Sequence, residues 1–433
     1  MKPYVFKLFY LICIAFLPFA SAHAQTEYTL YELCTLANTN AETIKIAEED
    51  LYIAEQEKKR ALSVLIPRFT AFASHTEYKD DTMSTPNVMT KGIKLTQSFT
   101  LNGRELIALD VTKRSIEERQ LSLDSIRAEY LLQISQAYFQ ILSAERFVEI
   151  AQTDVERLEK HKNAVQEKVN VGSLTKTALY RAQAELSGSK TALVRAQNGV
   201  MQAKAALKNL VKIDDDFTLS YVDIEELRNY SCTLDGIKER ALSNRPEINQ
   251  TLKQIEIAKK TVKYEKSDYW PTFSLEAAYT DTRVKYSSSG GSANNDDDNF
   301  YVTGELSFTL YDGGLRKGTV QQALASERKA RNSLAILERG IVFETEQAFL
   351  ELETTKSELM TLQDELKSAD ENFNAVKMQF QYGMADSVDI MDANTLLVTA
   401  QRNISDARYR YIVSVLNIIY TQGDLLPFLL KQT

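Results

Sequence analysis

The chain has 433 residues, of which 44% are apolar and 25% charged, a composition typical of a folded protein. Glycine (15 residues) and proline (7 residues) are scarce for this length, which favours long uninterrupted helices. The formal net charge of −8 excludes the basic surface of nucleic-acid-binding proteins, so we expect no nucleic-acid partner.

Residues 1–24 have the pattern of a secretory signal peptide. Lys2 and Lys7 supply the positive end, residues 8–20 form an apolar run, and residues 22–24 (Ala-His-Ala) offer a small-x-small cleavage site. The apolar run is short for a membrane span, which needs about 20 residues. We therefore expect cleavage, with an uncleaved anchor helix as the alternative.

Export restricts where the mature chain can reside. No later stretch is apolar over 18 residues, so the protein is expected to be periplasmic, secreted, or a β-barrel in the outer membrane. Cys34 and Cys232 are the cysteines of the mature chain. An oxidising compartment permits a disulfide between them, but their spacing leaves open whether they meet.

The mature sequence contains an internal duplication. Pro67 and Pro271 follow helical runs of the same length, residues 99–103 resemble 308–313, and residues 169–172 resemble 380–383. Three anchors in one order indicate two structural repeats. We place the first repeat at 25–233, the second at 234–422, and a C-terminal tail at 423–433.

Each repeat is predicted to run helix, two strands, very long helix, helix. In the first repeat the helices cover about 30–65, 104–170 and 174–212, and the strands about 67–79 and 88–101. In the second, the helices cover about 234–269, 315–380 and 386–420, and the strands about 270–284 and 299–311. Pro246 follows a cap-like Asn244-Arg245, which indicates that the opening helix of the second repeat is two helices.

The predicted strands alternate apolar and polar side chains, which gives each one an apolar and a polar face. The pattern is clearest in the apolar positions Phe273, Leu275, Ala277 and Tyr279. Polar loops are expected at 79–88 and 285–299.

Two sets of residues lie at the ends of the predicted strands. The loop at 285–299 contains the acidic run Asp296–Asp298, which we expect at a solvated tip. Tyr269, Trp270 and Tyr311 lie at the opposite strand ends. They form either an aromatic girdle or ordinary packing at the junction with the helices.

The helix expected at 104–170 contains no proline or glycine and would be about 100 Å long. Its apolar residues fall into two heptad columns, which is typical of a coiled-coil seam. The columns are Ile134, Ile141, Val148, Val155 and Val169, and Ala137, Ala144, Ala151, Leu158 and Val165.

Four strands per chain are too few to close a barrel, and lipid does not tolerate open sheet edges. Several chains must therefore combine. Two copies would give 8 strands, whose interior side chains fill, and three copies would give 12, which leaves a lumen.

Residues 382–393 (Tyr-Gly-Met-Ala-Asp-Ser-Val-Asp-Ile-Met-Asp-Ala) resemble the hairpin-tip motif of TolC-type outer-membrane efflux proteins, and residues 171–182 are their first-repeat counterpart. With the signal, duplication and strand pairs, the resemblance covers nearly the whole mature chain. It implies an internally duplicated α+β membrane protein. The implied assembly is a homotrimer with a 12-stranded β-barrel, four strands per chain, continuous with a long α-helical coiled-coil barrel in the periplasm.

The same resemblance implies location in the cell outer membrane, in contact with its lipid. It implies the exit duct of a tripartite efflux or type I secretion system. Its partners would be a periplasmic adaptor (membrane fusion) protein and an inner-membrane RND or ABC transporter. Ducts for drugs, metals and proteins share these features, so the cargo stays open.

By the same resemblance, Asp389 and Asp392 face the lumen near its periplasmic mouth and form carboxylate rings that favour cations. Acids in a first helical turn also stabilise the helix dipole by about 0.3–1 kcal/mol, and Asp386 fits that role as an N-cap. Lys176 and Arg181 replace the acids in the first tip. We hypothesise that one of them pairs with Asp389 or Asp392 and helps to keep the mouth shut.

Gly172 and Gly383 lie at the two helix reversals, where a positive φ is often needed. These turns would also form the surface that an adaptor meets. Ala178 and Ala385 stand where some family members carry charged latch residues, so a latch pairing is not carried over.

Catalysis is not expected. His23, His75 and His161 lie far from each other and from the cysteines in sequence, and no nucleotide-binding or nucleophile motif is present. We therefore expect no cofactor and no metal site. The alternative function is a structural or adhesive coiled-coil protein of the cell surface, which accounts for the heptads and export but not for duplicated strand pairs.

Overall fold

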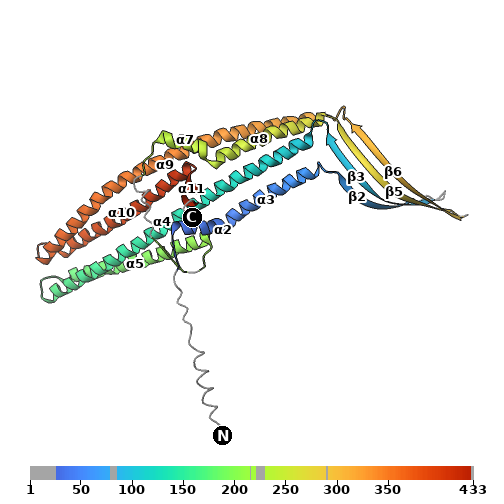
Figure 1. Cartoon of the computed structure of the whole chain (residues 1–433). Coiled ribbons are helices and arrows are strands. Elements are labelled where there is room, and N and C mark those ends of the chain that lie inside the picture. The colour runs from blue at the N-terminus through green and yellow to red at the C-terminus, as the bar shows by residue number, and fades with distance from the viewer. Residues whose placement is uncertain (1–25, 79–84, 215, 221–229, 289–290, 431–433) are drawn as a thin grey trace, which may run out of the picture.

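The computed structural model describes residues 26–78, 85–214, 216–220, 230–288 and 291–430. The molecule is elongated, with a sheet at one end and the tips of helical hairpins at the other (Figure 1). The predicted signal peptide lies outside the described residues. Among those described, no helix combines the length and the apolar character that crossing a membrane requires.

The two predicted repeats are present and have closely matching elements. The first contains α2 (Leu30–Asn40), α3 (Glu42–Ser63), β2 (Arg68–Glu77), β3 (Thr85–Thr100), α4 (Arg104–Asn170) and α5 (Lys176–Val211). The second contains α7 (Leu234–Asn244), α8 (Pro246–Lys266), the 3-10 turn η1 (Ser267–Tyr269), β5 (Thr272–Ser288), β6 (Gly291–Ser307), α9 (Leu315–Gln381) and α10 (Ser387–Thr421). The long helices α4 and α9 are 67 residues each.

The expected single helix at 30–65 is wrong, because the chain breaks at Ala41 between α2 and α3. Ala41 has φ −64° and ψ 126°, and Arg245, between α7 and α8, has nearly the same values (φ −62°, ψ 128°). Such an extended ψ cannot continue a helix. Pro246 signals the second break in the sequence, whereas Glu42 occupies the equivalent position in the first repeat.

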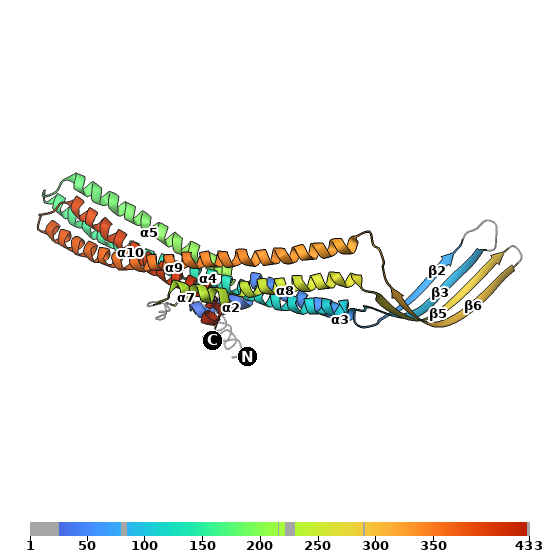
Figure 2. The ribbon, with the colours of Figure 1, turned by 90° about the horizontal axis from the view of Figure 1, so that it is seen from above.

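A four-stranded antiparallel sheet joins the two repeats in the order β2-β3-β5-β6. The central pair, β3 with β5, runs from Thr85 opposite Ser287 to Thr100 opposite Thr272. Figure 2 shows the four strands curving together away from the helices. In this sheet β2 and β6 are the outer strands, each paired on one side.

In the half of the sheet nearer the helices, the register aligns most apolar side chains of the four strands on one face. Cross-strand partners lie on the same side of a sheet, and one such row runs Phe69, Leu95, Ala277, Val302. Phe69, Phe300 and Leu306 are each more than 60% exposed in the chain. The opposite face carries polar rows such as Thr96, Glu276, Thr303. The predicted alternation is thus confirmed.

The acidic run Asp296–Asp298 lies in strand β6 and not in the predicted loop at 285–299. These residues pair with Arg283, Thr282 and Asp281 of β5. The Arg283 guanidinium lies 3.8 Å from the Asp296 carboxylate and 3.9 Å from that of Asp281, which offsets repulsion among the acids. The predicted strand at 299–311 therefore begins earlier, at Gly291, and ends earlier, at Ser307. The other predicted loop is also shorter, because β3 begins at Thr85.

Where the helices converge, they share a core that the sequence pattern did not predict in full. The short strand β1 (Thr26–Tyr28) pairs in parallel with β4 (Phe217–Leu219), and the predicted tail contains α11 (Leu425–Leu430). Cys34 is a free thiol buried in this core, and burial raises its pKa to about 12. Cys232 is also free.

A substitution at Gly92 in β3 tests the register between β3 and β5. A Cβ at this position would lie 2.3 Å from the Tyr279 carbonyl oxygen of β5, whereas one at Gly304 would meet only the Phe273 ring at 3.5 Å. Gly92→Ala is therefore expected to destabilise the sheet by about 1–3 kcal/mol, the usual effect of overpacking. The measurement is the urea midpoint of the sheet signal in circular dichroism, with Gly304→Ala as control. Equal midpoints for the two variants would contradict the register.

Candidate functional site

The two helical hairpins lie side by side and end at the same pole of the molecule. The first is formed by α4 and α5 and the second by α9 and α10; α4 also packs against α10 (Figure 2). An apolar cluster near the tips contains Val165 of α4, Leu179 of α5, Phe373 of α9 and Ile390 of α10. The tips are therefore held to each other by a shared core.

Both tips have the same backbone turn. Gly172 has φ +78° and Gly383 has φ +76°, as expected at these reversals. The amide of Ser173 donates to the Lys168 carbonyl at 2.8 Å, and that of Met384 donates to the Gln379 carbonyl at 2.8 Å. These bonds define a Schellman turn, in which glycine relieves the strain of the left-handed conformation. A Cβ on either glycine would meet no atom within 4 Å, so the positive φ, and not a lack of space, is the reason for glycine at these positions.

The helices that leave the tips are capped by side chains. Thr175 caps α5, and Asp386 caps α10 by accepting from the amides of Val388 (2.7 Å) and Asp389 (3.0 Å). Asp386 is thus the predicted N-cap. The Asp389 carboxylate in turn accepts from the Asp386 amide at 2.8 Å, which completes a capping box. Asp389 therefore has a local structural role, whatever else it does.

The two acids of the proposed gate share one exposed face of α10. Its buried face consists of Ser387, Ile390, Met391 and Asn394, whereas Asp389 and Asp392 are exposed. Lys176 and Arg181 are also exposed, on the first two turns of α5. Within the described protomer neither base forms an ion pair with either acid, so the hypothesised pairing would require a neighbouring chain.

A polar stripe on α4 joins the two hairpins and was missed by the sequence reasoning. It consists of Asp154, His161 and Lys168, which are spaced seven residues apart and flank the apolar seam. A heptad spacing places all three on one side of the helix, facing the second hairpin. The seven-residue spacing of these polar residues is the feature of the sequence from which the stripe could have been predicted.

Each residue of the polar stripe contacts the second hairpin. The buried Asn394 amide of α10 donates to Asp154 at 2.7 Å, and its oxygen accepts from Arg157 at 2.6 Å. His161 Nε2 and the Ser387 hydroxyl lie 3.0 Å apart, and the Lys168 ammonium donates to the Phe380 carbonyl at 2.6 Å. Buried polar groups satisfied in this way specify one arrangement of the helices.

His161 is neutral in this environment. Burial, reinforced by the positive charge of Lys168, lowers its pKa to about 4. Its ring also lies tilted against Phe380, with the ring centroids 5.1 Å apart. A proton on His161 would therefore place an unpaired charge in the contact between the hairpins.

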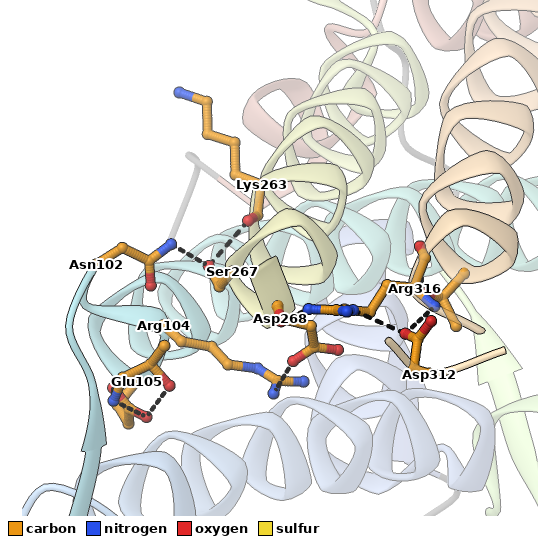
Figure 3. A network of polar contacts seen from close by, with 10 residues as sticks. Asn102, Arg104, Glu105, Lys263, Ser267, Asp268, Asp312 and Arg316 are labelled. Carbon is orange, nitrogen blue, oxygen red and sulfur yellow. Dashed lines mark hydrogen bonds and ion pairs between the residues drawn. The ribbon is translucent and has the colours of Figure 1, made fainter. Parts of the chain in front are cut away.

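At the opposite end of α4, polar contacts form a neck where the strands meet the helices (Figure 3). Arg104, from the start of α4, forms an ion pair with Asp268 of η1, and its guanidinium lies over the Tyr264 ring. Arg316, at the start of α9, donates to the Asp268 carbonyl at 3.3 Å and to Asp312 at 2.7 Å. One 3-10 turn thus receives an arginine from each repeat.

Further contacts fix the neck. The Asn102 amide donates to the Ser267 hydroxyl at 2.8 Å, and Glu105 accepts from the Thr100 amide at 3.0 Å. Tyr269, one of the aromatic residues at the strand ends, lies beneath the Arg316 guanidinium at 4.9 Å. The orientation of the sheet relative to the long helices is therefore set by named side chains.

A curved antiparallel sheet with one apolar face, continued by two long helical hairpins, is the fold of outer-membrane channel proteins. The Campylobacter jejuni CmeC outer membrane channel superimposes with a TM-score of 0.79 at 18% identity, covering 92% of this chain and 86% of that chain. The family profile "Outer membrane efflux protein" matches residues 33–211 and 238–421. The chain belongs to this family, and its two matched segments fall within the two repeats.

Two curated relatives extend the comparison. The chain is 22% identical over 416 residues to outer membrane protein TolC of Salmonella enteritidis, covering 93% of this chain and 83% of that protein. It is 21% identical over 316 residues to the cobalt-zinc-cadmium resistance protein CzcC of Cupriavidus metallidurans, covering 72% and 70%. The TolC-type resemblance and the outer-membrane location are thereby confirmed, and the protein is an outer-membrane efflux protein.

The buried histidine predicts how stability depends on pH. The folded-state pKa near 4 lies below the unfolded value of about 6.5, so the unfolded chain takes up a proton first as the pH falls. Stability is therefore lost between about pH 6.5 and 4, by roughly 2 kcal/mol from pH 7 to 4.5. His161→Gln should remove that part of the loss. Unfolding midpoints of both proteins at the two pH values measure it; an identical pH dependence would contradict the burial of His161.

Proposed function

We propose that three copies of this chain form an exit duct across the outer membrane. The single observation that carries the proposal is the sheet, with one apolar face exposed and outer strands β2 and β6 each paired on one side. Backbone groups on an open edge have no partner in lipid, so β6 of one copy pairs with β2 of the next. Three copies close a 12-stranded barrel with a lumen.

In this assembly the two faces of the sheet meet different solvents. The apolar face contacts lipid and the polar face lines water, as in other membrane barrels. The helical hairpins of three copies continue the lumen as an α-helical barrel in the periplasm. Transport through the duct is passive, so a separate pump supplies the energy. Only 3 histidines, 3 cysteines and 8 methionines occur in the chain, which favours small organic molecules or proteins as cargo over soft metals.

The gate lies at the tips. Asp392 has no hydrogen-bond or ion-pair partner within the described protomer, and Asp389 is already engaged in the capping box. Threefold symmetry would arrange each acid as a ring of carboxylates at the periplasmic mouth. Lys176 or Arg181 of a neighbouring copy then partners these acids in the closed state.

The partners are an adaptor and a pump. The Schellman turns at Gly172 and Gly383 present backbone groups and the exposed side chains of Val171, Tyr382 and Met384 at the end of each hairpin, a surface suited to the tip of a periplasmic adaptor protein. The adaptor links the duct to an inner-membrane RND or ABC transporter. CzcC is named for metal resistance, but the described residues at the tips of this chain include no cysteine, and Met384 is the exposed soft ligand there.

The duct and its gate are tested by one set of bilayer recordings. The purified protein should be a trimer in detergent and should give cation-selective conductance in a planar bilayer. Asp392→Asn should lower the cation selectivity severalfold without affecting assembly, because it removes three carboxylates and leaves the capping box intact. Asp364→Asn, at an exposed position on α9, is the matched control. A soluble monomeric rod without conductance would instead favour a structural or adhesive role. Unchanged cation selectivity of Asp392→Asn would show that Asp392 is not part of the gate.

Docking at the tips is tested with substitutions that keep the turn. Asparagine tolerates the left-handed conformation, and its Cβ at Gly383 meets no atom within 4 Å in this chain. Gly383→Asn should therefore leave trimer assembly and conductance unchanged. Export in cells should fall about tenfold or more if an adaptor contacts this turn. Asparagine at Gly188, an exposed position in α5 away from the tip, is the control; normal export by Gly383→Asn would contradict docking there.

A further inference from the structure

A cavity of about 300 Å³ lies between the hairpins, beside the polar stripe, and the function proposed above does not use it. The apolar part of its lining, called the floor here, includes Leu158 and Ala164 of α4, Phe373 of α9, and Ile390 and Met391 of α10; His161, Gln381 and Asn394 also line the cavity. The volume is at the lower end of the range for small-molecule sites.

The rim of the cavity is cationic. Arg157, Lys160 and Lys168 of α4 and Lys377 of α9 all line it, and its lining contains no aspartate or glutamate. This contrasts with the net charge of −8 for the chain. Among the described residues only Arg157 of these four cations has a carboxylate within 4 Å, so the cluster raises the local affinity for an anion.

Two of these four cations have partners within the chain, and the other two have none among the described residues. Arg157 donates to Asn394 and lies 3.9 Å from the Asp154 carboxylate, and Lys168 donates to the Phe380 carbonyl. Lys160 and Lys377 are exposed, and neither has an ion-pair or hydrogen-bond partner among the described residues. They come from different hairpins and line the same cavity.

The geometry points to a binding site for a small amphipathic anion, with an apolar ring system and a single carboxylate or sulfonate. The rings would occupy the apolar floor, and the acid group would lie between Lys160 and Lys377. A phospholipid with two acyl chains is far larger than the cavity. A neutral apolar molecule would leave the two lysines without a counter-charge.

The bound anion holds the two hairpins together, an effect called fastening below. The floor and the rim draw residues from α4 of the first hairpin and from α9 and α10 of the second, so a ligand bridges all three helices. It also lies beside the His161–Ser387 contact and adds attraction to the arrangement of the hairpins described here. A ligand that binds this arrangement better shifts the population toward it. This consequence for opening, though not the binding itself, rests on the proposed duct function.

The probe is 1-anilinonaphthalene-8-sulfonate, whose fluorescence rises in apolar surroundings. It is titrated into the full protein in lipid nanodiscs, with empty discs as background. We expect saturable binding that weakens with added salt, because screening reduces the attraction of exposed lysines. The double variant Lys160→Gln/Lys377→Gln should weaken binding by about tenfold, or ~1.4 kcal/mol.

Two matched controls separate the site from general charge effects. Lys162→Gln/Lys367→Gln removes the same charge from the same two helices outside the cavity lining and should leave the affinity unchanged. Ala164→Leu fills the floor and should weaken binding of the probe and also of the neutral N-phenyl-1-naphthylamine. The lysine variant should weaken only the anionic probe. Equal affinity of wild type and Lys160→Gln/Lys377→Gln, or unimpaired binding by Ala164→Leu, would overturn the site.

A second measurement tests the fastening. In planar bilayers, at a probe concentration near the dissociation constant of the wild type, the probe should lower the opening frequency of the wild-type protein several-fold and have much less effect on Lys160→Gln/Lys377→Gln. Binding without any change in opening would overturn the fastening and leave the site standing. Absence of conductance in the wild type would refute the proposed duct instead, while the nanodisc titration would still decide the site.

Discussion

Unpaired backbone groups are the constraint on which this molecule depends. Each amide and carbonyl that meets hydrocarbon needs a partner in the protein, and a four-stranded sheet leaves one side of β2 and one side of β6 open. The apolar face makes water an equally poor environment for the isolated sheet. In the proposed duct, neighbouring copies supply these partners, and the helices that follow each strand pair would be arranged around the same axis.

The two repeats are joined at three levels along the molecule. In the sheet, β3 pairs with β5; at the neck, Arg104 and Arg316 converge on one turn; near the tips, the polar stripe contacts α10. The first joint uses backbone hydrogen bonds, and the other two use side chains. A polar side chain can exchange one partner for another more readily than two strands can exchange a continuous ladder of backbone hydrogen bonds. Any rearrangement is accordingly expected among the helices and not in the sheet.

Most of the fold followed from residues whose conformational limits are strict. Pro67 and Pro271 end the opening helices, Gly172 and Gly383 mark the reversals, and α4 has the predicted bounds. The break at Ala41 has no local signal, and only its equivalence to Arg245 in the second repeat reveals it. The acidic run Asp296–Asp298 was predicted in a loop because its polar composition indicates exposure to solvent. Its backbone is a strand because it pairs with β5. The spacing of the polar stripe is visible in the sequence, but its contacts are not, because Asp154 and Asn394 are far apart in the sequence and meet only after folding.

The uninterrupted course of α4 has a mechanical consequence. The helix begins at the neck and ends at Asn170, so a rigid tilt about a pivot beside Arg104 would act over a lever arm of about 100 Å. A tilt of about 3° at the pivot would displace the far end by about 5 Å, close to one helical pitch. Small adjustments of the neck are thus magnified at the periplasmic pole, and a stiff rod transmits them without local unfolding.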